Sequence, residues 1–187
     1  MISYLHETGI YFILYKAHSV GFCIYYTKCS GIIKEKDMKI AIGCDHGAFD
    51  MKLLIMEHLK EQGHELKDFG SYDKNSIDYP AIGRATAEAV ASGECDKGIV
   101  LCTTGIGISI VANKVKGVRA ALCNDCTSAR LTRMHNDANV LALGGGVIGP
   151  NLALDIVDIF FSTEFSGEEK HVRRLSQVAG IEEEVYK

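Results

Sequence analysis

A cysteine followed by a glycine-rich turn is the part of the sequence best suited to chemistry. Cys102 ends the apolar run Ile99–Leu101 and is followed directly by Thr-Thr-Gly-Ile-Gly. Gly105 and Gly107 let the backbone turn sharply and bring its N–H groups close to a ligand. Residues 109–114 are typical of the first turns of a helix, whose free N–H groups and dipole favour an anion. The sequence therefore predicts a thiol beside an anion site; the alternative is a tight turn that buries Cys102 as a small side chain.

An acid and an imidazole follow the first predicted strand, residues 39–43. Asp45 and His46 stand next to each other in this turn, where they could orient a substrate hydroxyl or bind a phosphate. The alternative is that Asp45 caps the next helix and His46 is simply exposed. Further along, Asp78-Tyr-Pro either lines a pocket or forms a turn.

Two more polar groups lie at helix termini in the second half of the chain. His135 closes a predicted helix, where it is either a cap favoured by the helix dipole or a general acid and base. In the second case, the neighbouring Asn136 amide would contact substrate hydroxyls. Lys170 and Arg174 are four residues apart on the last predicted helix, so they share a face. Most such clusters are solvated, but this pair could hold a phosphate.

Composition and short motifs exclude several classes of function. The 187 residues carry a net charge of −4 and no basic run, so we expect no nucleic-acid partner. Gly-x-Gly lacks the third glycine of the dinucleotide fingerprint, and no Gly-Lys-Ser/Thr follows it, which excludes a P-loop. Seven cysteines without a secretory signal predict free thiols in a reducing, cytoplasmic compartment. Cys123-x-x-Cys126 has no second pair and no histidine at ligand spacing, so we expect no metal there.

Alternating strands and helices must position these residues. Repeated βα units of this length predict a parallel sheet covered by helices on both faces. Because such sheets bind ligands at the carboxyl ends of their strands, Cys102 and Asp45 are expected at one edge. The predicted strands are 39–43, 64–69, 99–102, 118–123 and 140–143, and the predicted helices are 49–62, 79–92, 108–114, 127–135, 150–161 and 168–178.

Residues 1–37 do not fit this pattern, whereas Met38 begins a complete domain pattern. We therefore expect residues 1–37 to be a non-domain N-terminal extension and residues 38–187 to form the domain. The segment 9–26 is apolar and aromatic-rich, but Lys16 and His18 interrupt it and it is short for a bilayer span. It also lacks the basic region and cleavage site of a signal peptide. We expect no membrane partner; a weak amphipathic contact is the alternative.

Taken together, the motifs resemble those of the type B ribose-5-phosphate isomerases, which share a superfamily with the galactose-6-phosphate isomerases. The resemblance covers essentially residues 38–187. It implies a Rossmann-like three-layer α/β/α sandwich with a five-stranded parallel sheet, a homodimer or dimer of dimers, and no metal or organic cofactor. The motifs that carry it are Gly43-Cys-Asp-His46, Asp78-Tyr-Pro80, Cys102-Thr-Thr-Gly-Ile-Gly-Ile-Ser109, Ala112-Asn-Lys114 and His135-Asn-Asp-Ala-Asn139.

The resemblance also implies an activity, the interconversion of ribose 5-phosphate and ribulose 5-phosphate through an enediolate in the pentose phosphate pathway. It implies that Cys102 moves the proton between C1 and C2, with Thr104 beside the transferring oxygens. It further implies that His135, from the neighbouring subunit, opens the furanose ring with the help of Asp45. The other implied substrate contacts are the backbone N–H groups of Thr103, Thr104, Gly105, Ile106 and Gly107 at the enediolate, His46, Lys170 and Arg174 at the phosphate, and Asn136 at a hydroxyl.

The sequence departs from the family pattern at the phosphate end. Gly146 stands where the family usually has an arginine that reaches the phosphate across the dimer, and Thr103 stands where it has a glycine. Lys170 gives a point charge where a bidentate guanidinium is usual. We therefore predict phosphate binding that is weaker or tuned to another sugar phosphate, and a lower KM for ribose 5-phosphate in the Gly146→Arg variant.

Two other functions stay open at this stage. One is isomerisation of a six-carbon sugar phosphate such as allose 6-phosphate or galactose 6-phosphate, which the pocket near Asp78 and Tyr79 would decide. The other is a non-catalytic module that binds a sugar phosphate, which would not need Cys102, Asp45 and His135 together. Cys102 and His135 lie on one chain, which favours a self-sufficient homodimer over an enzyme with two kinds of subunit.

Overall fold

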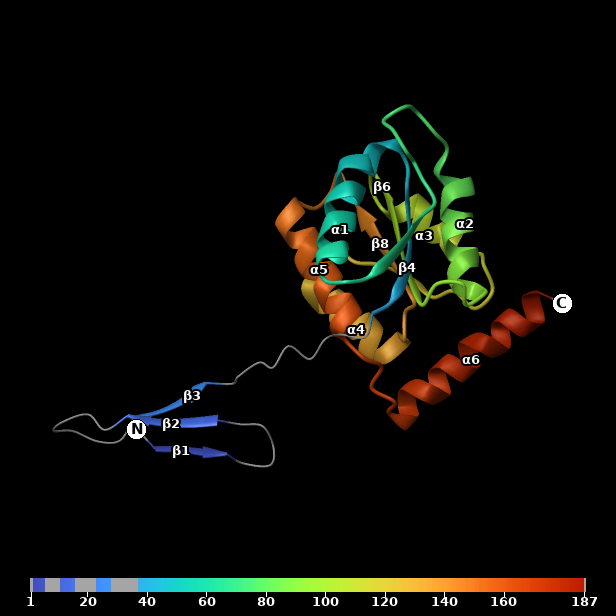
Figure 1. The fold of residues 1–187 in the computed structure, drawn as a ribbon. Coiled ribbons are helices and arrows are strands. Elements are labelled where there is room, and N and C mark those ends of the chain that lie inside the picture. The colour runs from blue at the N-terminus through green and yellow to red at the C-terminus, as the bar shows by residue number, and fades with distance from the viewer. Residues whose placement is uncertain (1, 6–10, 16–22, 28–36, 187) are drawn as a thin grey trace. The chain divides into compact units, whose positions relative to one another are not determined.

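Five parallel strands, in the order β5-β4-β6-β8-β7, form the sheet that positions the candidate site (Figure 1). This is the computed structural model of the chain, and the predicted five-stranded parallel sheet is confirmed. The strands are β4 (Lys39–Cys44), β5 (Glu65–Asp68), β6 (Lys97–Cys102), β7 (Ala120–Leu122) and β8 (Val140–Gly144).

Helices join these strands within a few residues of the predicted bounds. They are the short 3₁₀ helix η1 (His46–Ala48), α1 (Phe49–Glu61), α2 (Tyr79–Ala91), α3 (Ile106–Ala112), α4 (Cys126–Asn136), α5 (Pro150–Ser162) and α6 (Glu169–Val185). The predicted end of the last helix, at residue 178, was wrong. The Tyr186 hydroxyl donates to the Lys114 carbonyl at 2.9 Å, and Glu182 accepts the Gly117 N–H at 3.1 Å. These contacts hold the final turns, in which Val178, Ile181 and Val185 recur at helical spacing but are exposed.

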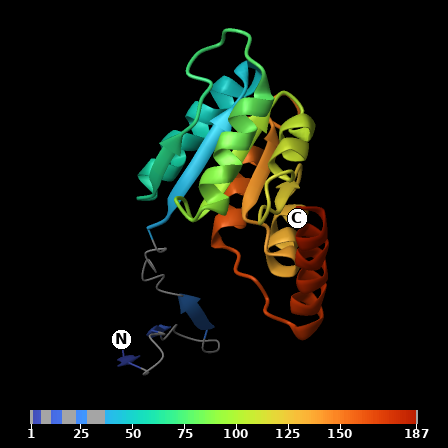
Figure 2. The same ribbon diagram turned by 90° about the vertical axis from the view of Figure 1, so that its right-hand side faces the viewer.

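Helices cover both faces of the sheet, as Figure 2 shows. Side chains of alternating strand residues, such as Ile40 and Ile42, pack on one face against α1, α4 and α5. The residue between them, Ala41, belongs to a second buried cluster against α2 and α3. Both faces are therefore buried, which is why the strands read as continuous apolar runs.

The order of the strands places a switch point between β4 and β6. The chain passes from β4 to β5 on one side, and then crosses to β6 on the other side of β4. Open α/β sheets bind ligands outside the carboxyl ends of the strands at such a point. Asp45 follows β4 there, and Cys102 ends β6; the Asp45 N–H donates to the Leu101 carbonyl at 3.1 Å.

A buried lysine, not expected from the sequence, fixes the loop beside this edge. Lys52 of α1 is 0% exposed, and its Nζ lies 2.8 and 2.7 Å from the two carboxylate oxygens of Asp68. The same ammonium donates to the Ser71 carbonyl at 2.7 Å. Its position three residues before Ile55 and seven before Leu59, on the core face of the helix, is the signal that was available. Lys52 thus anchors the loop that leads to α2.

The structure describes residues 2–5, 11–15, 23–27 and 37–186. The chain divides into two units, residues 1–36 and 37–187. In the first unit, β1 (Ile2–Leu5), β2 (Tyr11–Tyr15) and β3 (Cys23–Thr27) pair antiparallel in that order. Lys16 and His18 of the apolar segment lie outside the described residues, and the assignment of residues 1–37 as an extension stays a prediction. None of the described helices is long and apolar enough to cross a bilayer.

Candidate active site

The Cys102 thiol faces the glycine-rich turn. Its Sγ accepts a hydrogen bond from the Gly105 N–H at 3.1 Å and lies 4.0 Å from the Thr104 hydroxyl. The side chain is 5% exposed. The donor belongs to the turn at the start of α3, so the sulfur lies beside backbone N–H groups that precede the helix. Cys102 also belongs to the buried cluster on the α2 and α3 face of the sheet, so its catalytic role stays a prediction.

Two glycines permit this geometry. Gly105 has φ +74°, and a Cβ there would lie 2.6 Å from Leu122 Cδ1 and 2.7 Å from the Leu143 carbonyl carbon. A Cβ on Gly107 would lie 2.6 Å from the ring of Tyr79. Since such distances are far below van der Waals contact, any larger residue would displace the turn. The packing also brings Tyr79, of the Asp78-Tyr-Pro segment, against the start of α3.

Two other buried cysteines have raised pKa values. Burial raises the pKa of Cys44, at the end of β4, to about 11, although Lys52 opposes the shift. Burial likewise raises the pKa of Cys123 to about 11, with a further contribution from Asp125. These two thiols are therefore protonated near neutral pH and are poor bases.

Asp45 and His46 sit at the neighbouring strand end. Asp45 is 7% exposed and accepts the Gly47 N–H through Oδ1 at 2.9 Å, so the expected cap forms. The Ile77 N–H donates to Nδ1 of His46 at 3.2 Å, which leaves the proton of the neutral ring on Nε2. A cavity of about 310 Å³ opens beside His46 and is also lined by Lys74. Lys74 forms an ion pair of 2.8 Å with Asp50, which also lines the cavity, so the His46 ring is the donor that this end of the site offers to an anion.

Thr103 and Gly146, the two departures from the family pattern, are packed against each other. A Cβ on Gly146 would lie 3.0 Å from Thr103 Cγ2 and 3.1 Å from the Thr103 carbonyl oxygen. On its other side, the Thr103 hydroxyl is 2.1 Å from where a Cβ on Gly47 would stand. The Gly146 N–H also donates to the Thr103 carbonyl at 2.9 Å. The threonine thus occupies space that a side chain at position 146 would need.

This contact refines the prediction for Gly146→Arg. We expect the Cβ of the arginine alone to press against the Thr103 methyl group, whereas Thr103→Gly with Gly146→Arg removes that contact and leaves only the backbone carbonyl of residue 103. The double variant should lower KM for ribose 5-phosphate by about tenfold or more, as for one added charge-assisted contact. Steady-state kinetics of both single variants and the double variant measure the coupling. If the effects of the two single substitutions on KM simply multiply in the double variant, the proposed contact between positions 103 and 146 is contradicted.

The remaining predicted residues form a second group, which lies toward the amino ends of the strands, away from Cys102. The Asn139 carbonyl, just past α4, accepts the Gly98 N–H near the amino end of β6. Gly98 is four residues from Cys102, which corresponds to about 13 Å along a strand. The structure therefore does not bring the end of α4 together with the thiol of the same chain. This second group consists of His135 and Asn136 at the end of α4 and Lys170 and Arg174 on α6.

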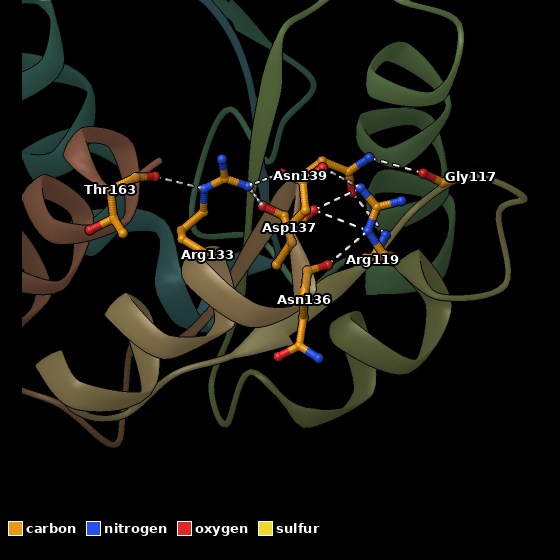
Figure 3. A network of polar contacts seen from close by, with 8 residues as sticks. Gly117, Arg119, Arg133, Asn136, Asp137, Asn139 and Thr163 are labelled. Carbon is orange, nitrogen blue, oxygen red and sulfur yellow. Dashed lines mark hydrogen bonds and ion pairs between the residues drawn. The ribbon is translucent and has the colours of Figure 1, made fainter. Parts of the chain in front are cut away.

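A network of two arginines around Asp137 fixes the end of α4 (Figure 3). Asp137 has φ +44°, a left-handed conformation that ends the helix. Arg133, 3% exposed, holds its carboxylate at 2.8 Å, and Arg119 holds it at 3.0 Å. In Figure 3 the Asn136 side chain points away from this network, while its carbonyl accepts from Arg119 Nε at 3.0 Å. Sequence reasoning missed these arginines; the i,i+4 spacing of Arg133 and Asp137 was the available signal.

Comparison with known proteins agrees with these features. A family model described as Ribose/Galactose Isomerase matches residues 40–178. The chain belongs to this family. It is therefore an aldose–ketose isomerase of sugar phosphates.

Several relatives are similar over most of their length. Ribose-5-phosphate isomerase B of Escherichia coli is 46% identical over 78% of this chain and 97% of its own. A galactose-6-phosphate isomerase subunit of Clostridium acetobutylicum is 49% identical, over 68% and 74%. The solved ribose-5-phosphate isomerase B of Clostridium thermocellum is 53% identical with a TM-score of 0.78, over 79% and 99%. The isomerase chain thus shares its fold, and the predicted family is confirmed.

Proposed function

We propose that this isomerase interconverts ribose 5-phosphate and ribulose 5-phosphate through an enediolate, with Cys102 as the base. The observation that supports this most directly is the Cys102 Sγ, which accepts the Gly105 N–H at 3.1 Å within a turn rich in N–H donors. Proton abstraction next to a carbonyl needs a base and a set of donors for the developing oxyanion. The turn supplies both within a few residues.

The proton transfer begins on the open-chain aldose. The Cys102 thiolate removes the proton from C2, the electron pair forms the C1–C2 double bond, and the carbonyl oxygen takes the negative charge. The N–H groups of the turn 103–107 precede the first α3 hydrogen bond, from the Ser109 N–H to the Gly105 carbonyl. Since the Gly105 N–H donates to Cys102 and the Ile106 N–H donates to the Thr104 hydroxyl, we assign the contacts to that oxygen to the N–H groups of Thr103, Thr104 and Gly107. The thiol then returns the proton to C1, while the proton on O2 passes to O1 beside the Thr104 hydroxyl. The product is the ketose.

Ring opening must precede this step, since the aldose is mostly a furanose. It requires an acid that protonates the ring oxygen and a base that takes the proton from the C1 hydroxyl, as the bond from C1 to the ring oxygen breaks. We assign these roles to His135 and Asp45. Asp45 follows the carboxyl end of β4, whereas His135 lies toward the amino ends of the strands. A second copy of the chain therefore supplies His135. We accordingly propose a homodimer, or a dimer of dimers, with shared sites.

The phosphate lies at the His46 end of the site. Its cavity and the Nε2–H of His46 provide one side, and Lys170 and Arg174 of the second copy provide the other. Asn136 of the same copy contacts a substrate hydroxyl. All these residues lie within 38–187, which supports placing the whole site in that domain and residues 1–37 outside it. We propose a cytoplasmic enzyme in the pentose phosphate pathway.

A substrate panel tests the proposal. The full chain is given ribose 5-phosphate, allose 6-phosphate and galactose 6-phosphate in turn, and conversion of aldose to ketose is followed. We expect the highest kcat/KM for ribose 5-phosphate. A clear preference for a hexose phosphate would replace the pentose by the six-carbon alternative, which the similar galactose-6-phosphate isomerase subunit and Gly146 favour. Binding of all three without turnover would leave only a binding module.

A further inference from the structure

A second histidine lies against the proposed ring-opening residue. His171, on the first turn of α6, is 3% exposed, whereas His135 at the end of α4 is half-buried. The centroids of the two imidazole rings are 4.3 Å apart, and the ring planes are tilted by 40°. The contact therefore limits the orientations that the His135 ring can adopt.

His171 is itself fixed by a short chain of hydrogen bonds. Its Nδ1 and the Ser166 hydroxyl share a hydrogen bond of 2.8 Å. The Ser166 N–H donates to the carbonyl of Met134, the residue before His135, at 3.1 Å. The His171 N–H donates to the Glu168 carbonyl at 2.8 Å. The buried imidazole is thus tied to the same turn of α4 that carries His135.

Charges around the pair favour one protonation pattern. Burial lowers the pKa of His171, and the neighbouring His135 lowers it further. Lys170 and Arg174 act in the same direction, and Glu168 opposes them. The lowered pKa keeps the His171 imidazole neutral near neutral pH, so this ring acts through its packing and its hydrogen bond to Ser166.

We propose that His171 is a positioning residue for ring opening, which holds the His135 imidazole in the orientation that delivers a proton to the ring oxygen of the sugar. This inference rests on the proposed function and deepens it. Misplacement of a catalytic group by about 1 Å costs on the order of 10²-fold in rate. Loss of the packed ring should therefore slow ring opening without removing any group that touches the phosphate.

Exchange between the α and β anomers of ribose 5-phosphate isolates this step, because anomers interconvert only through the open chain. The measurement uses the full-length Cys102→Ala variant, in which proton transfer between carbons is removed, and NMR exchange spectroscopy. We expect this variant to accelerate anomer exchange, and Cys102→Ala/His171→Ala to lose about tenfold or more of that acceleration. The dissociation constant for ribose 5-phosphate should stay within about twofold.

Three further variants sharpen the result. His171→Phe keeps a flat ring against His135 and should retain more acceleration than His171→Ala, and it serves if the alanine variant folds poorly. Ser166→Ala removes only the anchor and should give an intermediate loss. Val172→Ala, an exposed neighbour on α6, is the matched control and should change nothing.

The outcomes separate the inference from the function it rests on. If the wild-type chain does not isomerise ribose 5-phosphate, the proposed function fails. If it does, the role of His171 is overturned by unchanged anomer exchange in the His171→Ala variant, by no acceleration in Cys102→Ala, or by a loss of rate that merely follows a loss of binding. A selective loss of exchange with intact binding supports it.

Discussion

Cys102→Ala is expected to lower kcat for ribose 5-phosphate by about 10²–10⁴-fold, the range that a positioned general base contributes. The Sγ lies 3.1 Å from the Gly105 N–H, and an alanine has no atom that could accept a proton there. Substrate binding should fall only modestly, because the N–H groups of the turn and the phosphate contacts remain. Steady-state kinetics, with a dissociation constant from calorimetry, separate the two effects.

Cys95→Ala is the matched control for this prediction. Cys95 is another buried cysteine, 2% exposed, and it lies just before β6, at the other end of that strand from Cys102. The same chemical change there should leave kcat within about twofold while costing some stability. Turnover close to wild type in Cys102→Ala would remove the thiol from the mechanism.

Mixing two inactive variants is expected to restore activity. If each site combines Cys102 of one chain with His135 of the other, Cys102→Ala and His135→Asn each inactivate both sites of their own dimers. In a mixed dimer, one site carries both substitutions and the other carries neither. Random exchange makes about half of the dimers mixed, so about one quarter of wild-type activity should return. Activity is measured before and after subunit exchange of the equimolar mixture.

A control sets the baseline for this complementation. Cys102→Ala mixed with Asp45→Asn should not recover, because both residues lie at the same strand ends of one chain and every mixed site lacks one of them. Recovery in both mixtures would show that the groups are not divided between subunits as proposed. Recovery in neither would place His135 in the site of its own chain or outside the mechanism.

Much of the fold could be predicted because its signals are local. β6 and β8 are runs of apolar residues with no polar gap, and turn glycines mark where helices begin. The orientation of Cys102 toward Gly105 also follows from neighbouring residues, since a strand, a glycine turn and a helix start fix its direction. The start of α6 was predicted within one residue, but its C-terminal end was not. The contacts of the last turns are made by Tyr186 and Glu182, whose partners lie about 70 residues away.

The rest of the site depends on contacts that sequence spacing does not show. His171 packs on His135 across α4 and α6, and the order of these helices in the chain does not show which of their residues face each other. Lys52 and Arg133 look like ordinary surface charges in the sequence, yet both are buried and satisfied by distant carbonyls and carboxylates. The distance between His135 and Cys102 likewise follows from the topology of the sheet and from neither motif alone.

The contact between Thr103 and Gly146 constrains the order in which these two positions can change over generations. A glycine at position 103 is harmless beside Gly146, whereas a large residue at position 146 arrives in space already filled by the Thr103 methyl group. Descendants of this sequence would reach arginine at 146 most easily after position 103 had first become glycine. By the same steric argument, an ancestor with arginine at position 146 would have lost it before threonine appeared at position 103.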